Sequence, residues 1–454
     1  MSYSDGFFDV SPQHGFLPIQ GSLKTLPMEY SSLQHILDHM PVTDINGDEG
    51  YLSTPGLLPQ MVKKLPDYTD LVNDESNKLV LAALFRGYTF LASSYLLEPA
   101  YQHFKVTGEY GKANRILPSN IAKPLCTVAS KLDVFPWLDY SYAYALGNYR
   151  LIDPKGGLVW SNLKLNVSFS GKEDERGFIL VHVDINQFSP YLIESFETIL
   201  GSSDNVQMLD GLKLCLSTML RMNERRQQMW AASQPTRYND FRIFIMGIEG
   251  NDAIFGDGVI YEGVSDQPKR YRGQSGSQDT IIPTLDTMFR VIDYYPKNEL
   301  TEYLLDMRKY RPKVFQRYLR DLEDRSLGIW DQVEKICGAE GLLLVVDILT
   351  QIYHFRNGHW QFVQKYIMGN TKYNVATGGT PVTTWIPNQI EATLKAMEEV
   401  MKRLEQQELS EGQKSDLEYH QLNLDAKVEL LSDQIKTLSK NFNARMYWFE
   451  PKDD

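Results

Sequence analysis

The histidine with the most informative surroundings is His359. It lies between Gly341 and Ile367, in a segment whose apolar residues recur at helical spacing. At about 100° per residue, it falls in the middle of an apolar face that also contains Ile348, Ile352, Phe355, Phe362, Val363 and Tyr366. Arg356 lies almost one turn earlier, about 60° around the helix. An imidazole on such a face can ligate a porphyrin iron, and the arginine can pair with a propionate.

Other histidines, and a simpler role for His359, have to be weighed against this reading. A buried histidine normally finds a backbone or side-chain partner, and His359 could be such a residue. His354 lies about 140° away on the same helix, among polar residues, and is predicted to be solvated. His182 follows Phe178 and Val181 on another apolar helical face, a pattern more typical of a core histidine than of a functional one.

The composition excludes several classes of protein. The sequence has no dinucleotide-binding, P-loop, HExxH or GxSxG motif. Its three cysteines lie far apart, which excludes a disulfide framework and a thiolate zinc site. The net charge is −12 and no long basic run occurs, so we expect no nucleic-acid partner. The N-terminus has no secretory pattern and the apolar stretches are short, so we expect a cytoplasmic protein without a membrane partner.

The elements that position these residues are predicted to be almost all helices. Apolar spacing indicates helices over 77–97, 178–188, 208–233, 284–294 and 341–367, with loops across 249–280. The turn-rich run LIDPKGGLVWSN, residues 151–162, indicates a domain boundary. We therefore expect a mostly all-α protein. A small N-terminal domain with an irregular arm covers residues 1–154, and a large helical domain covers residues 155–387.

The C-terminal part, residues 388–454, has a different pattern. Two charged segments, 388–407 and 415–440, are heptad-like and are separated by Ser410-Glu411-Gly412. Two such helices with a short connection predict an antiparallel hairpin. Its apolar faces are expected to dock on the main body or on a second subunit, and the hairpin is expected to be dispensable for cofactor binding.

Five ordered blocks of the sequence resemble the indoleamine 2,3-dioxygenase family across roughly residues 80–385. The blocks are ILPSNIAKPLCTVASKLDVFPWLDYSYAYALGNYRLIDP (116–154), GFILVHVDI (177–185), RIFIMGIEGNDAIFGDGVIYEG (242–263), RYRGQSGSQDTIIPTLDTMFRVI (270–292) with YLLDMRKYRPKVFQRYLRDLE (303–323), and YHFRNGHWQFVQKYIMGN with ATGGT (353–380). The resemblance implies a two-domain helical protein that binds haem b, with the small domain capping the distal side of the haem.

The resemblance also implies roles on the proximal side of the haem. His359 matches the ligand of the haem iron, in agreement with the helical-face argument. Arg356 matches the arginine that pairs with a propionate, and Asp286 matches the acidic residue beside it. Metal-binding sites generally need such polar partners just outside the ligands, because these partners orient the ligands. Gln274 and Ser275 fall near the haem edge.

On the distal side, the resemblance implies a substrate pocket. Arg242 matches the arginine that holds the substrate carboxylate, a role suited to its planar fork. Phe178 and Tyr238 match pocket aromatics against which an indole packs. His182 matches the residue above the iron. Thr380 matches the threonine of a loop that closes over the substrate.

The sequence departs from the family pattern at four positions. His182 replaces a small hydroxyl residue, although the related tryptophan 2,3-dioxygenases carry a distal histidine that can bond the indole N–H. Ser141 stands where the family has a tyrosine, and Tyr144 where it has a smaller residue. Gln274 replaces a glycine. The distal half therefore resembles the family less closely than the proximal half.

These observations favour a haem-dependent dioxygenase that cleaves the indole C2–C3 bond of L-tryptophan or a related indole amine, giving an N-formylkynurenine-type product. The partners would be molecular oxygen, the indole and an electron donor that reduces ferric haem. One alternative is monooxygenation or rearrangement of an indole derivative on the same scaffold. Another is a haem sensor without catalytic activity, whose hairpin transmits a signal to a partner.

Overall fold

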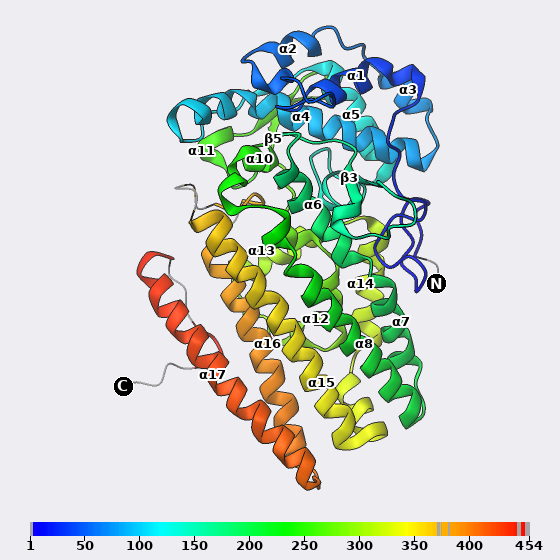
Figure 1. The fold of residues 1–454 in the computed structure, drawn as a ribbon, viewed down its shortest axis with the longest axis vertical. Helices are drawn as coiled ribbons and strands as arrows, with labels where there is room; N and C mark the ends of the chain where they lie inside the picture. The colour runs from blue at the N-terminus through cyan, green and yellow to red at the C-terminus, as the bar shows by residue number, and fades with distance from the viewer. Residues whose placement is uncertain (1–2, 370–372, 374, 380–381, 443–445, 450–454) are drawn as a thin grey trace.

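The computed structural model describes residues 3–369, 373, 375–379, 382–442 and 446–449. The chain is mainly helical and has two parts, a compact N-terminal part and a bundle of long helices (Figure 1). The helices of the N-terminal part are α1 (Ser31–His39), α2 (Leu57–Val62), α3 (Thr69–Asp74), α4 (Lys78–Thr107) and α5 (Ser119–Leu132). Those that follow are α6 (Glu173–Asn186), α7 (Ser189–Gly201), α8 (Asn205–Arg226), α9 (Met229–Ala232), α10 (Asn239–Arg242), α11 (Asp252–Phe255), α12 (Ile281–Met288), α13 (Glu299–Arg308), α14 (Lys313–Arg325), α15 (Ile329–Phe362), α16 (Val382–Leu404) and α17 (Glu411–Phe442).

Helix α4 forms the core of the N-terminal part. The Asn77 side chain caps its first turn by accepting a hydrogen bond from the Leu79 amide at 3.0 Å. The helix ends at Gly108, which adopts the left-handed conformation (φ 75°) that glycine tolerates best. Most of the residues from Val80 to Tyr101 are buried. A helix that is apolar on every side has to be covered on every side, which explains its central position.

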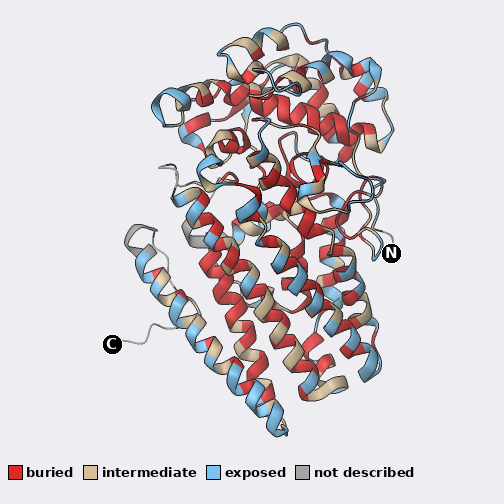
Figure 2. Cartoon of the chain, viewed as in Figure 1, coloured by how far each residue is buried: buried red, intermediate tan, exposed pale blue. Residues whose placement is uncertain are grey.

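Helix α15 is the central helix of the bundle and packs against α8 and α16. Its backbone is kinked at Gly338, whose φ of 54° lies outside the helical region. A π-helical turn, Val363–Met368, continues the helix beyond Phe362. The residues that α15 turns toward α8 and α16 are largely buried (Figure 2).

The strands are short and tie distant segments together. β1 (Ile116–Leu117) pairs in parallel with β4 (Val259–Tyr261), which pairs antiparallel with β5 (Ser265–Lys269). β2 (Tyr149–Leu151) and β3 (Leu163–Leu165) form an antiparallel hairpin. The turn-rich run at 151–162, predicted as a domain boundary, is thus mainly the connection within this hairpin.

The N-terminal arm crosses onto the helical bundle. Phe8 packs against Phe315 of α14, with 4.9 Å between ring centroids. Tyr3 and Tyr318 of α14 form an edge-to-face pair at 5.3 Å. The arm therefore buries its aromatic side chains against the larger part of the chain.

The C-terminal hairpin has the predicted form, and its apolar faces are covered by the chain itself. Helix α17 runs along α16 and contacts α15. It buries Leu417, Leu424, Leu431 and Ile435, which recur at heptad spacing, and leaves its outer face exposed (Figure 2). His420 of α17 also lies 3.3 Å from Asp347 of α15.

Two helices are long and apolar enough to cross a membrane by length and composition alone, namely Lys78–Thr107 and Ile329–Met368. Inside the protein, 89% and 61% of their most apolar windows are buried. Such burial is typical of core helices.

Candidate functional site

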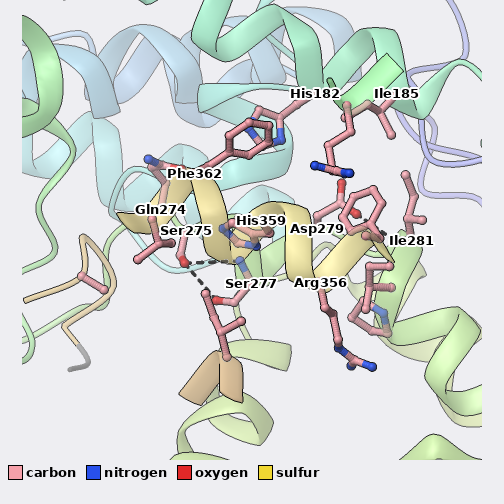
Figure 3. A pocket seen from close by; sticks show the side chains of 18 of the residues that line it. His182, Ile185, Gln274, Ser275, Ser277, Asp279, Ile281, Arg356, His359 and Phe362 are labelled. Atoms are coloured by element: carbon pink, nitrogen blue, oxygen red, sulfur yellow. Dashed lines mark hydrogen bonds between the residues drawn. The ribbon is translucent and has the colours of Figure 1, made fainter. Parts of the chain in front are cut away.

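A cavity of about 230 Å³ lies between α6, α15 and the segment that leads into α12. One buried water needs only about 10–15 Å³, so the cavity can hold a much larger ligand. Helix α6 contributes Phe178. It also contributes His182, and α15 contributes His359 (Figure 3). The glycine-containing segment before α12 contributes Gln274, Ser275 and Gly276. The sequence predicted most of these residues, although it did not indicate how they meet.

His359 lines the cavity, whereas His354 is exposed on another face of α15. Burial, together with the nearby charges of His182 and Arg226, lowers the pKa of His359 to about 4. The imidazole is therefore neutral at physiological pH, the form that binds metals. A Cβ placed on Gly276 would lie 3.6 Å from His359 Cε1 and 4.0 Å from Nε2. Glycine thus leaves open the space beside the ring.

Arg356 lines the cavity and is held in a buried polar network. Its guanidinium forms an ion pair with Asp286 and donates to the Gln389 side chain at 3.3 Å. It also donates to the Thr393 hydroxyl at 2.5 Å. The Asp286 carboxylate accepts from Arg356, as the resemblance implied. Since Gln389 and Thr393 belong to α16, the C-terminal hairpin helps to position this arginine.

The cavity also contains cations that the sequence did not single out. Arg311 donates from Nη2 to the carbonyls of Ser277 and Asp279 at 2.6 and 3.0 Å. Its buried Nε and Nη1 have no hydrogen-bond partner among the described residues, and burial lowers its pKa to about 9. The Arg226 guanidinium lies against Gly358, where any Cβ would clash with it.

These features fit a haem group. Haem b is a flat ring with two carboxylates and an iron that accepts an imidazole ligand. The neutral His359 can provide the ligand, and Gly276 leaves room beside it. The partnerless nitrogens of Arg311 are donors that a buried carboxylate would satisfy.

His182 faces the cavity from α6 and is held by Tyr140. The Tyr140 hydroxyl lies 3.2 Å from His182 Nδ1 and donates to Asp279 Oδ2 at 2.7 Å. Burial lowers the pKa of His182, so this ring is also neutral at physiological pH. Asn186, one turn further along α6, donates to the same carboxylate at 3.0 Å.

Aromatic rings surround Phe178 at the cavity wall. Its ring centroid lies 4.8 Å from that of Tyr238, 5.5 Å from that of Phe241 and 5.8 Å from that of Tyr366. Tyr144 lines the cavity as well, and its buried hydroxyl has no hydrogen-bond partner in the described part of the chain. This wall can pack against a planar aromatic ligand, and the Tyr144 hydroxyl can form a hydrogen bond to that ligand.

Two predicted residues, Arg242 and Ser141, are not among the described residues that line the cavity. Arg242 is buried behind Tyr238 and donates to the Tyr110 hydroxyl at 3.2 Å and to the Val375 carbonyl at 2.7 Å. Ser141 is buried in the π-helical turn Tyr140–Tyr144 and has no surface in the cavity lining. Thr380 lies outside the described residues.

Sequence reasoning missed Tyr140, Asp279, Arg226 and Arg311. Asp279 and Tyr140 are separated by 139 positions, so no local spacing pattern could connect them. The only signal was their presence inside blocks that resemble the family. Arg226 had a weaker one, since it lies in a charged run within the predicted helix 208–233.

The chain is similar to several known proteins. The family model described as indoleamine 2,3-dioxygenase matches residues 5–440 of the chain, a range that includes both helices of the hairpin almost to their end. Indoleamine 2,3-dioxygenase 1 of Rattus norvegicus is 25% identical over 307 residues, which cover 62% of this chain and 74% of the relative. Indoleamine 2,3-dioxygenase 2 of Homo sapiens is 26% identical over 416 residues, 86% of this chain and 94% of the relative. A myoglobin of Haliotis diversicolor is 26% identical over 269 residues, 58% of this chain and 68% of that protein.

Proposed function

The chain belongs to the indoleamine 2,3-dioxygenase family, and from this premise we propose that it is a haem-dependent dioxygenase of L-tryptophan or a related indole amine. The reaction would open the C2–C3 bond of the indole and give an N-formylkynurenine-type product. Relatives named indoleamine 2,3-dioxygenase support this substrate class.

The observation that carries the proposal is the pairing of two different walls in one cavity. One wall offers a neutral imidazole, that of His359, with open space beside Gly276. The other wall offers aromatic packing from Phe178 and Tyr238 and a second neutral imidazole, that of His182. A cofactor ligand and an aromatic substrate surface thus face the same space.

The residues of the chain would bind and orient rather than react. His359 would hold the iron, and Arg356 and Arg311 would neutralise propionates. Phe178 and Tyr238 would fix the indole plane, and the apolar cavity would exclude water. When bound, haem would supply the activation of O₂, because cofactors carry this chemistry and the protein supplies orientation and electrostatics.

Product analysis under ¹⁸O₂ tests this proposal. Haem-loaded protein is reduced anaerobically, mixed with ¹⁸O₂ and a panel of indoles, and the products are identified by mass spectrometry. We expect two labelled oxygen atoms in a ring-opened product of L-tryptophan or a close analogue. One labelled atom would instead indicate monooxygenation, the alternative that the altered residues Ser141, His182 and Gln274 suggest.

A second candidate function is reversible oxygen binding without turnover, as the name of the relative from Haliotis diversicolor implies. The placement of Arg242 favours this candidate, since its guanidinium donates to Tyr110 and Val375 and it is not among the described residues that line the cavity. A stable ferrous–oxygen spectrum without consumption of any indole in the same experiment would support this function over the first.

For the setting of the reaction, we propose a cytoplasmic protein that receives electrons from a separate donor. Among the described residues, no group of three or more His, Cys, Asp or Glu side chains could hold a metal ion of a second redox centre. The C-terminal hairpin would stabilise the haem-binding bundle, with α17 shielding α16 and α15 from solvent.

A further inference from the structure

A hydrogen-bonded chain of three side chains ends at the cavity. It runs from Asp279, before α12, through Tyr140 in the π-helical turn to His182 on α6. His182 and Asp279 are both visible beside the cavity in Figure 3. Each link joins segments that are far apart in the sequence, so the chain exists only in the folded protein.

The direction of each hydrogen bond follows from the donors around Asp279. Its Oδ1 accepts from the Ile281 amide at 2.8 Å, and its Oδ2 accepts from the Asn186 side chain at 3.0 Å. The same Asn186 nitrogen donates to the His182 carbonyl at 2.9 Å, and because both partners are acceptors the amide orientation is fixed. The carboxylate is therefore surrounded by donors and has no proton of its own to give.

Tyr140 must then donate its single proton to Asp279. Burial, with the nearby Asp279 charge, raises the pKa of Tyr140 well above its ordinary value, so the phenol keeps its proton. Because that proton points at Asp279, the Tyr140 oxygen can only accept from His182. His182 must supply the proton from Nδ1.

We propose that Asp279 and Tyr140 are positioning residues that hold His182 in the Nδ1–H tautomer, so that Nε2 is a hydrogen-bond acceptor for the ligand. No hydrogen bond from the described part of the chain reaches Nε2, and His182 lines the cavity. A neutral imidazole has one donor nitrogen and one acceptor nitrogen, so fixing the first fixes the second. The cavity would therefore select an aromatic ligand with a ring N–H over one without it.

The substrate class in this inference rests on the proposed function, but the tautomer does not. The first measurement is therefore the ¹H–¹⁵N correlation spectrum of histidine-labelled protein, with ferrous haem and CO and again without haem. The His182 signals are assigned from their loss in His182→Gln. We expect a protonated Nδ1 and an unprotonated Nε2 in both samples, whether or not tryptophan is turned over.

Asp279→Ala should release the chain. With its acceptor removed, the Tyr140 proton is free to turn toward His182 Nδ1, so we expect a mixture of tautomers in which Nε2 is partly protonated. Tyr140→Phe removes the acceptor of the Nδ1 proton and should also leave a mixture, which tests the same point if Asp279→Ala does not fold. Tyr142→Phe is the matched control, because the Tyr142 hydroxyl bonds Asp5 at 2.6 Å and takes no part in the chain.

Ligand discrimination provides the second readout. In the wild type, L-tryptophan should bind about 10-fold more tightly than its benzothiophene analogue, in which sulfur replaces the ring N–H. Asp279→Ala should weaken this preference and Tyr142→Phe should keep it. A protonated Nε2 in the wild type, or a tautomer unchanged by Asp279→Ala and Tyr140→Phe, would overturn the proposal. Failure of tryptophan to bind with the expected tautomer present would count against the proposed substrate alone.

Discussion

At the scale of single residues, the difference between His359 and His354 decides the site. The two lie on the same helix, yet only His359 faces the cavity. The helical period alone predicted this difference, because five residues correspond to about 140° of rotation. The chemistry of His359 depends on its burial, which keeps the imidazole neutral.

Gly276 tests whether the space beside His359 is a ligand site. An added Cβ would lie 3.6 Å from the imidazole, an ordinary contact distance, so Gly276→Ala should fold and bind haem nearly normally. The larger Gly276→Val should fill the space. We expect an overpacking cost of about 1–3 kcal/mol in haem affinity, roughly 10- to 100-fold, measured by haem titration. Equal haem affinity in the Val and Ala variants would argue against a ring in this space.

The buried imidazole also predicts a dependence of stability on pH in the haem-free protein. Unfolded His359 takes up a proton near its ordinary pKa of about 6.5, whereas the folded protein does so only near pH 4. Between these values the unfolded state binds more protons, so the free energy of unfolding falls as the pH falls. The urea midpoint should decrease more steeply across this window in the wild type than in His359→Gln. Parallel curves would show that His359 is not buried as described.

Arg242 is predicted to exchange its present partners for a substrate carboxylate. Removing a charge-assisted contact should cost about 1.5–3 kcal/mol, or about 10- to 100-fold in the affinity for L-tryptophan. Tryptamine, which has no carboxylate, should bind equally well to the wild type and to Arg242→Ala. The exposed Arg237→Ala provides a matched control. If both amines lose affinity equally in Arg242→Ala, the arginine supports the fold and does not read the carboxylate.

The hydrogen-bond partners of Arg242 could not be predicted from the sequence. Its residue type and its place in the RIFIMGIEG block suggested a carboxylate ligand. Its actual partners, Tyr110 and Val375, lie more than 130 positions away on either side. Competition among such distant groups for one guanidinium depends on the packed structure and leaves no periodic signal.

At the scale of elements, α16 is part of the candidate site. It contributes Ile386 and Gln389 to the cavity lining, and Thr393 to the contacts of Arg356. Helix α17 covers α16 but contributes no residue to that lining among those described. The sequence predicted two helices here but not that one of them reaches the site.

Two truncations separate the roles of these helices. A chain ending at Leu409 keeps α16 and should still bind one haem, with a lower melting temperature because the partners of α17 become exposed. A chain ending at Trp385 lacks Gln389 and Thr393 and should lose haem binding, contrary to the expectation from sequence that the hairpin is dispensable. Haem titration and far-UV circular dichroism of both chains provide the measurement. Full haem binding by the shorter chain would restore the original expectation.

The helices themselves were largely predictable, and the short pieces between them were not. Apolar periodicity identified 341–367, which lies wholly within α15 and its π-helical turn. The predicted loop region 249–280 contains β4 and β5, whose few residues are too short to show alternation. The π-helical turn Tyr140–Tyr144 depends on Asp139, whose carboxylate accepts from the Tyr142 and Ala143 amides.

At the scale of the whole molecule, the cavity joins segments from across the chain. Tyr144 comes from the π-helical turn after α5, His182 from α6, His359 from α15 and Gln389 from α16. A ligand that contacts all of them would stabilise the folded chain as a unit, because binding to the folded state alone raises its stability. The central claim is that this ligand is haem, held by His359.

Haem titration of three proteins tests that claim most directly. The wild type should bind one haem per chain, with a Soret band and a raised melting temperature. His354→Ala should behave in the same way. His359→Ala should lose the haem or its normal spectrum, and added imidazole should restore the spectrum by entering the vacated space. Haem binding that survives in His359→Ala without imidazole, or that is lost in His354→Ala instead, would contradict the account.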